Sequence, residues 1–282
     1  MTRPLRALLY VPASNPRALA RARGLACDGV IVDLEDAVGP DQKDGARTAM
    51  VEAITAGGFQ APTVVVRVNG LETPWGEADL RAALDAQPDA ILVPKVRGRD
   101  DLRAWSARMT RTPAAPPLWA MLETCAAIMN LGEISACATA VRLEALVMGL
   151  EDLAREMHCR PGSDRAPLLP ALAGAVTAAR AAGLAALDGV FPGLGDPDGL
   201  RTQCEQGRAL GFDGKTVIHP DQIDATIRAF SPSLSEIQWA RQVVEAFGRP
   251  ESAGRGVLRL DGRMIERLHL EEAQDVLRLA QS

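Results

Sequence analysis

The sequence predicts an α/β protein, a closed (β/α)8 or TIM barrel followed by a C-terminal helical extension. The chain has 282 residues, a length that α/β barrels reach as one domain. Eight short apolar runs recur along it, each followed by a stretch with helical spacing, and this pattern allows a closed barrel or an open doubly wound sheet. No G-x-G-x-x-G motif follows the first run. This absence and the count of eight favour the barrel.

The eight predicted strands lie at residues 6–12, 29–35, 63–68, 89–94, 118–123, 143–149, 186–191 and 214–219. Most of them are continuously apolar rather than alternating, as expected for parallel strands that are covered on both faces. The run at 186–191 is the least regular, because Asp188 and Gly189 interrupt it. We assign all eight to one parallel sheet.

Helical spacing is clear after the second strand, where the apolar residues share one face: Ala46, Ala49, Met50, Ala53 and Ile54. Gly57 and Gly58 then supply a stop. A proline-rich connector at residues 110–117 precedes the fifth strand, and a helix is predicted at 235–247. The predicted domains are a barrel at residues 1–247 and an extension at 248–282, in which a turn and one amphipathic helix form a lid, an oligomer contact or plain packing.

Composition excludes several classes of function. The formal net charge of −5 argues against a nucleic-acid partner, for which a basic stripe is typical. No apolar run reaches the ~18 residues of a membrane span, and the first residues lack the apolar core of a signal peptide. The five cysteines have no C-x-x-C spacing and indicate neither a disulfide framework nor a zinc site. We therefore expect a cytoplasmic protein with no membrane partner.

Charged and polar residues gather at the carboxyl ends of the predicted strands, where barrels of this kind carry their chemistry. They are Asp33, Glu35, Asp36, Arg67, Asn69, Lys95, Glu123, Glu151, Asp152 and His219. Carboxylates that lie close together repel one another unless a cation neutralises them. Oxygen ligands without paired cysteines or clustered histidines favour Mg²⁺, and Glu123 and Asp152, from neighbouring strands, suit it. The alternative for Asp36 and Asp152 is that they cap the following helices.

Arg67 closes an apolar run, where a solvated arginine would be out of place. Its guanidinium there could bind a substrate carboxylate or face a developing oxyanion, or form a structural salt bridge to Glu35 or Asp33. Lys95 raises the rival mechanism of a Schiff-base aldolase, which needs a lysine of lowered pKa; the neighbouring acids would instead hold its ammonium charged. The role of His219 stays open between a base and an orienting hydrogen-bond partner.

A set of motifs follows in fixed order over residues 5–247: LLYVPAS, GVIVDLEDAV with Ala46-Arg47 behind it, VVVRVNG, ILVPKV, LWAMLET, VMGLEDLA, AARAAGLAALDGVF, GFDGKTVIHPDQI and FSPS. Together these motifs resemble the citrate lyase beta-subunit family, a branch of the Mg²⁺-dependent aldolases that includes malyl-CoA and citramalyl-CoA lyases. The resemblance is specific for the family and less so for a substrate within it.

The resemblance implies a barrel that assembles as a homotrimer or hexamer and acts on acyl-CoA thioesters of hydroxy acids. Glu123 and Asp152 would bind Mg²⁺, Arg67 and Glu123 would contact substrate, and Asp33 and Glu35 would orient metal-bound waters. The GLED form of the Asp152 motif is similar to the citrate lyase branch, which implies cleavage of citryl-CoA to acetyl-CoA and oxaloacetate.

One departure concerns the tail. Family members active on malyl-CoA or citramalyl-CoA carry a motif resembling GKMID, whose aspartate reaches a neighbouring subunit as acid/base. This chain has GRMIE, with Glu266 at that position. Glu266 is therefore the candidate acid/base, with one methylene more than the family's aspartate, and a small misplacement of a catalytic group can lose about a hundredfold in rate.

Several alternatives remain at this point. The chain could be a malyl-CoA or citramalyl-CoA lyase, or a CoA thioesterase that uses the same metal site. It could be a phosphoenolpyruvate-handling phosphotransferase, although no glycine-rich phosphate cradle is found. It could also be a non-catalytic subunit of a larger complex of the citrate lyase kind, served by an acyl-carrier thioester rather than by CoA.

Overall fold

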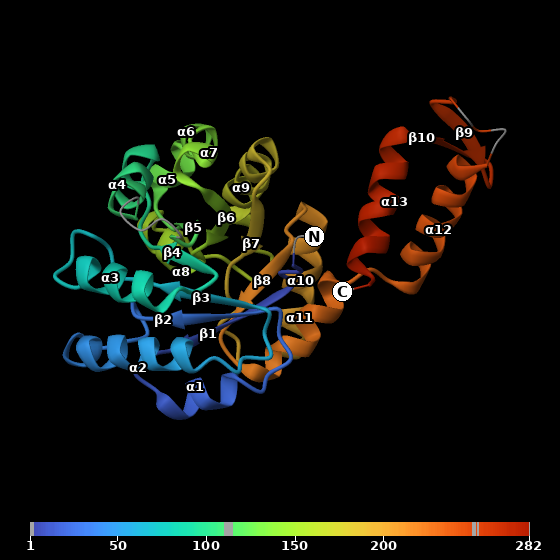
Figure 1. Cartoon of the computed structure of the whole chain (residues 1–282). Coiled ribbons are helices and arrows are strands. Elements are labelled where there is room, and N and C mark those ends of the chain that lie inside the picture. The colour runs from blue at the N-terminus through green and yellow to red at the C-terminus, as the bar shows by residue number, and fades with distance from the viewer. Residues whose placement is uncertain (1–2, 110–114, 250–251, 253, 282) are drawn as a thin grey trace.

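The computed structural model describes residues 3–109, 115–249, 252 and 254–281. Its centre is a closed barrel of eight parallel strands in sequence order (Figure 1). The strands are β1 (Ala7–Pro12), β2 (Gly29–Asp33), β3 (Thr63–Arg67), β4 (Ala90–Val93), β5 (Leu118–Leu122), β6 (Leu143–Met148), β7 (Ala185–Asp188) and β8 (Gly214–Val217). The register of β1 against β8 closes the ring, with Leu8 opposite Thr216. The predicted TIM barrel is thus confirmed.

Helices follow the strands and cover the outside of the barrel (Figure 1). They are α1 (Pro16–Ala22), α2 (Lys43–Ala56), α3 (Gly76–Ala86), α4 (Arg99–Met109), α5 (Cys125–Met129), α6 (Leu131–Ala136), α7 (Ala138–Val141), α8 (Leu150–Glu156), α9 (Leu169–Ala182), α10 (Pro197–Leu210) and α11 (Ile223–Phe230). The predicted stop of α2 is confirmed, since Gly57 follows it with φ of +61°, a conformation that glycine adopts without steric cost. None of the helices in the described segments is long and apolar enough to cross a membrane.

The inside of the barrel explains where polar residues can appear. Side chains of a strand alternate between its two faces, so Ile31 and Asp33 both point inward, as do Val65 and Arg67. The apolar members fill the barrel in one interior cluster that includes Leu8, Ile31, Val65, Leu92 and Val147. The polar members come one step later, at the carboxyl ends. The predicted strands were too long there, because the structure ends β2 at Asp33 and β8 at Val217.

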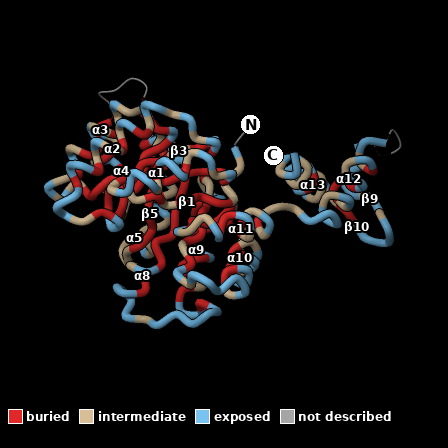
Figure 2. Tube along the Cα trace, turned by 90° about the horizontal axis from the view of Figure 1, so that it is seen from below, coloured by how far each residue is buried: buried red, intermediate tan, exposed pale blue. Residues whose placement is uncertain are grey.

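The C-terminal extension differs from the prediction in having a β-hairpin. It comprises α12 (Leu234–Gly248), β9 (Val257–Leu260), β10 (Arg263–Glu266) and α13 (Arg267–Leu279). These elements share a small apolar core of their own and stand apart from the barrel in Figures 1 and 2. The helix predicted at 235–247 is confirmed as α12. Because α12 packs on α13 and the hairpin, a boundary after residue 247 would divide this core, and we propose that the extension begins at residues 231–233 instead.

The proline-rich connector predicted at residues 110–117 falls largely outside the described residues, which resume at residue 115.

Candidate active site

The charged residues predicted at the strand ends converge on one rim of the barrel. Asp33 ends β2 and Arg67 ends β3, both facing inward, and Glu35, Lys95 and Glu123 follow β2, β4 and β5 directly. Asp152 lies in the first turn of α8, after β6, but the N-cap of this helix is Gly149, without a side-chain cap. The helix-capping alternative therefore does not hold for Asp152, whose carboxylate bonds Lys95 and Arg155 instead. The structure therefore brings together six residues that the sequence placed on five different segments, and their charges interact directly.

Arg67 is held on several sides. Its Nε and Nη2 donate to Asp33 Oδ1 and Oδ2 at 2.7 and 2.6 Å. Its Nη1 lies 2.8 Å from Glu35 Oε2, and its guanidinium stacks 4.9 Å from the ring centre of Tyr10. Burial alone would lower the pKa of Arg67, but the Asp33 carboxylate outweighs burial and raises the pKa well above its ordinary value. The salt bridge foreseen as an alternative is present, and it fixes the guanidinium in one place.

Asp33 acts as the anchor of this arrangement. Besides Arg67, its Oδ1 accepts the Glu35 N–H at 2.9 Å and its Oδ2 accepts the Ala37 N–H at 3.1 Å. The carboxylate is only 1% exposed, and the chain itself provides four donors to its two oxygens. Asp33 therefore orients Arg67 and the loop after β2.

Glu123, Asp152 and Lys95 form the second half of the site. Lys95 Nζ bonds Asp152 Oδ2 at 2.6 Å and lies 3.6 Å from Glu123 Oε1, and its backbone N–H donates to that same Glu123 oxygen at 2.7 Å. Burial raises the pKa of Glu123 and raises the pKa of Glu35 to about 8. Burial would also raise the pKa of Asp152, but its hydrogen bond from Lys95 lowers it. The site thus combines two carboxyl groups of raised pKa, Glu35 and Glu123, with one of lowered pKa, Asp152.

Lys95 keeps its charge in this setting. Burial lowers its pKa, but the Glu123 carboxylate and the bond to Asp152 outweigh burial and raise the pKa above its ordinary value. A Schiff-base lysine needs the opposite shift, so these neighbours argue against that mechanism.

The donor set fits a hard divalent cation. Glu123 Oε2 is buried and has no hydrogen-bond partner among the described residues. An added Cβ at Gly149 would lie 2.6 Å from this oxygen, so glycine leaves the room that the carboxylate needs. No group of three or more His, Cys, Asp or Glu side chains within the described ranges forms a complete metal site. Mg²⁺ is commonly bound by one or two carboxylates, while substrate and water fill its other coordination positions.

Sequence reasoning missed two supports of the site. Tyr10, which was not among the predicted site residues, is the stacking partner of Arg67. Lys43 is buried and donates to the carbonyls of Leu34 and Glu35 at 2.8 Å each and to Asn69 Oδ1 at 2.7 Å. Its ammonium therefore ties the loop that carries Glu35 to the end of β3. The sequence did contain a signal for the burial of Lys43, because this lysine lies on the same face of α2 as Ala46 and Ala53.

Three predicted residues lie outside this cluster. Glu151 is exposed on α8. His219 lies in the loop after β8, where its Nδ1 accepts the Asp221 N–H at 3.2 Å, and it lines a pocket of about 370 Å³ with Tyr10 and Arg17. Glu266 ends β10 in the extension, and its side chain accepts the backbone N–H of the third residue of α13. The structure thus gives Glu266 a helix-capping contact and does not bring it to the rim of its own barrel.

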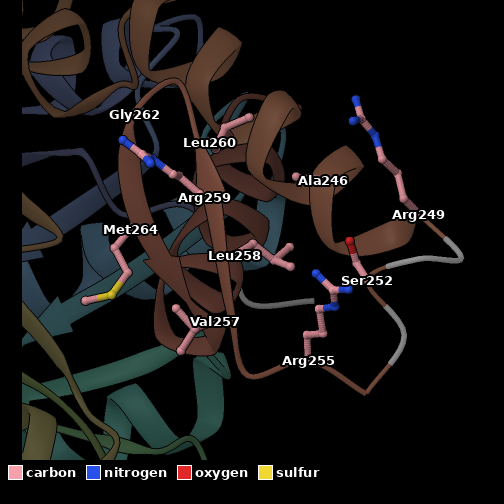
Figure 3. Close-up of a pocket in the computed structure, with 10 residues that line it drawn as sticks. All are labelled: Ala246, Arg249, Ser252, Arg255, Val257, Leu258, Arg259, Leu260, Gly262 and Met264. Atoms are coloured by element: carbon pink, nitrogen blue, oxygen red, sulfur yellow. The ribbon is translucent and has the colours of Figure 1, made fainter.

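The extension also contains a pocket of about 580 Å³ between the end of α12 and the hairpin (Figure 3). Its lining combines Arg249, Arg255 and Arg259 with apolar side chains such as Leu258 and Met264. Arg249 is paired with Glu245 at 3.1 Å. None of the residues predicted to carry the chemistry lines it, so the barrel rim is the candidate active site.

Comparison with known proteins identifies the family to which the chain belongs. Residues 6–220 match the model of the HpcH/HpaI aldolase/citrate lyase family. The chain is 44% identical to a (3S)-malyl-CoA thioesterase of Cereibacter sphaeroides, over 99% of this chain and 95% of the relative. It is 32% identical to a citrate lyase subunit beta of Leuconostoc mesenteroides subsp. cremoris, over 98% and 93% of the two chains. A crystal structure of CitE from Mycobacterium tuberculosis with magnesium, acetoacetate and coenzyme A superposes with a TM-score of 0.78 and 29% identity, over 99% and 98% of the two chains.

Proposed function

Because this chain belongs to the HpcH/HpaI aldolase/citrate lyase family, we propose that it is a Mg²⁺-dependent enzyme that cleaves the carbon–carbon bond of a 3-hydroxyacyl-CoA thioester. The products would be acetyl-CoA and a 2-keto acid, oxaloacetate in the case of citryl-CoA. The observation that carries the proposal is the buried Glu123 Oε2, which has no hydrogen-bond partner in the described part of the chain. It lies beside Asp152 and within electrostatic reach of Arg67.

Each residue of the rim has a role in this reaction. Glu123 and Asp152 would hold Mg²⁺, which when bound supplies Lewis-acid polarisation of a substrate oxygen. Arg67 would stabilise negative charge on the thioester oxygen of the departing enolate, because a preorganised cation needs no rearrangement as charge develops. Asp33 would hold Arg67 in position. Glu35, with a pKa of about 8, can hold or release a proton at its carboxyl oxygens near neutral pH.

A neighbouring copy of the chain would complete the site. Glu266 has no access to its own barrel rim in this structure, and exposed apolar residues mark both surfaces that such a contact would cover. On the segments that follow β5 to β8 these are Met129, at the end of α5, and Met157, Leu194 and Ile218. On the extension they are Val257, Met264 and Leu268. We propose that the extension of one subunit covers the rim of another in a homotrimer or hexamer and presents Glu266 as acid/base. A fully active monomer by light scattering would contradict this.

The decisive experiment is a panel assay of citryl-, malyl- and citramalyl-CoA with and without Mg²⁺, in which keto acid and free CoA are scored separately. Glu123→Gln should abolish Mg²⁺-dependent turnover and weaken Mg²⁺ binding by calorimetry. Glu151→Gln is the matched control, because it removes an exposed carboxylate from the turn that carries Asp152. Metal-independent turnover, or unchanged Mg²⁺ affinity in Glu123→Gln, would contradict the proposal. Activity that appears only with an added acyl-carrier partner would assign the chain to a citrate lyase-type complex.

A second candidate function is hydrolysis of the same thioester. It is favoured by the 44% identity to a (3S)-malyl-CoA thioesterase. Both reactions need a polarised thioester beside a fixed cation, so the rim residues would serve either one. Release of free acid and CoA from malyl-CoA without accumulation of keto acid would identify the thioesterase.

A further inference from the structure

Lys95 lies where a bound cation would be expected. Its Nζ is within 4 Å of four carboxylates from three separate segments of the rim, at 2.6 Å from Asp152, 3.6 Å from Glu123 and from Asp36, and 3.7 Å from Glu35. Two of these carboxylates, Glu123 and Asp152, are the proposed ligands of Mg²⁺. The ammonium therefore neutralises the same two carboxylates that the metal would use, at Oδ2 of Asp152 and Oε1 of Glu123.

The backbone at Lys95 supports this position. Its φ of +51° lies in the left-handed region, which is rare for a residue other than glycine and is tolerated where the surroundings demand it. In this conformation the Lys95 N–H donates to Glu123 Oε1 at 2.7 Å while the side chain reaches Asp152. One residue thus contacts both proposed ligands, with its backbone and with its ammonium.

The Lys95 ammonium and Mg²⁺ cannot both occupy the position between Glu123 and Asp152. An ion bound to Asp152 Oδ2 would lie beside the ammonium that now bonds the same oxygen, and two like charges at that separation repel strongly. Lys95 is able to leave, because its side chain is 32% exposed and an ammonium on a four-carbon stem is mobile. Arg67 is different, since Asp33, Glu35 and the Tyr10 ring all hold it.

We propose that Lys95 is a tethered cation that occupies the metal position in the metal-free protein and is displaced when Mg²⁺ binds. This inference rests on the proposed metal site. It explains how four carboxylates stay gathered around one point without a metal, although unpaired they would repel one another. It also means that the affinity for Mg²⁺ is set by competition with a residue of the chain.

The test is Mg²⁺ binding to the full chain by calorimetry, in three variants. Lys95→Met keeps the apolar stem and removes the charge. It should tighten Mg²⁺ binding by roughly tenfold or more, because one unit charge beside a divalent ion repels it by that amount even at the dielectric constant of water. Arg155→Met is the matched control, because Arg155 bonds the other oxygen of Asp152 at 2.6 Å but is 80% exposed; its effect should stay within about twofold. Lys95→Gln serves if Lys95→Met does not fold.

Thermal unfolding gives an independent readout. Metal-free Lys95→Met should melt below the native protein, and saturating Mg²⁺ should restore it. Unchanged or weaker Mg²⁺ binding in Lys95→Met, or equal tightening in Arg155→Met, would overturn the role of Lys95 while leaving the metal site intact. Absence of Mg²⁺ binding to the native chain, or native affinity in Glu123→Gln, would instead overturn the proposed metal site and this inference with it.

Discussion

Replacing Asp33 with asparagine tests the anchor of the site. Each oxygen of Asp33 accepts two hydrogen bonds, one from Arg67 and one from a backbone N–H of the loop after β2. An asparagine keeps one acceptor oxygen and turns its NH2 group toward two of the four donors. The guanidinium of Arg67 is then left buried with one of its two hydrogen bonds to residue 33 lost.

The expected loss is large. Removing one partner of a buried ion pair costs about 3–5 kcal/mol, and we expect the lower end, about 3 kcal/mol, because Arg67 keeps Glu35 and Tyr10 as neighbours. Urea unfolding of the metal-free protein, followed by circular dichroism, measures it. Turnover should also fall by about a hundredfold through the displaced guanidinium, with kcat affected more than KM.

Asp36→Asn is the matched control on the same loop. Asp36 is 57% exposed and lies 3.8 Å from Arg67, so its loss should cost under about 1 kcal/mol. If Asp33→Asn also costs under about 1 kcal/mol, the guanidinium is held by Glu35 and Tyr10 alone and the reasoning about the anchor is wrong.

Three further predictions concern charge. Arg67→Ala should lower turnover by about 10²–10³, the size of one lost oxyanion donor, and a near-native rate would exclude it as the enolate cation. Asp188 is buried between Lys215 and Arg165, so Asp188→Asn leaves two buried cations without their counterion and should cost about 3–5 kcal/mol in urea unfolding. Lys215→Met should cost less, because Asp188 keeps its ion pair with Arg165; equal losses would contradict this. Burial raises the pKa of Glu35 from 4.5 to about 8, so the folded protein keeps a proton that the unfolded chain releases between these values. Metal-free Glu35→Gln should therefore gain stability over the native protein as pH rises from 4.5 to 8, with no gain at lower pH. A pH-independent difference in unfolding free energy would refute the assigned burial effect.

The barrel and the convergence of its rim could be predicted because both follow from periodicity. Continuous apolar runs indicated parallel strands, and the alternation of a strand places Asp33 on the face of Ile31 and Arg67 on the face of Val65. Which of these charges pair was beyond the sequence, because pairing depends on how the strands stagger around the closed barrel. The sequence therefore predicted six of the residues that meet on the rim, although it also placed Glu151 and His219 there. The bond from Lys95 to Asp152 required the structure.

The irregular seventh strand illustrates the same limit. Asp188 looked like an interruption, yet β7 includes it as its last residue. Its carboxylate points between the barrel and the helices, where Arg165 and Lys215 neutralise it at 2.8 and 3.1 Å. Arg165 comes from the loop before α9, more than twenty residues earlier, and no local pattern links the two.

The hairpin of the extension did have a signal. Asp261 and Gly262, both with positive φ, form the Asp-Gly turn that is typical of a two-residue hairpin, and alternating apolar residues flank it. The packing of α12 against α13 and the hairpin had no signal in the sequence. An amphipathic helix shows that one of its faces is buried, but it does not show which element covers that face.

The two cations of the rim differ in how they are held, and this difference argues for separate roles in the proposed reaction. Arg67 is bonded, ion-paired and stacked, so it has one position in which to meet developing charge. The ammonium of Lys95 is held by carboxylates alone, and its side chain is 32% exposed. A divalent ion interacts more strongly with the same carboxylates and can therefore displace it. A Schiff-base role would need an amine free of such neighbours. In the proposed reaction the rim would therefore combine a fixed cation for the substrate with a displaceable one at the metal position.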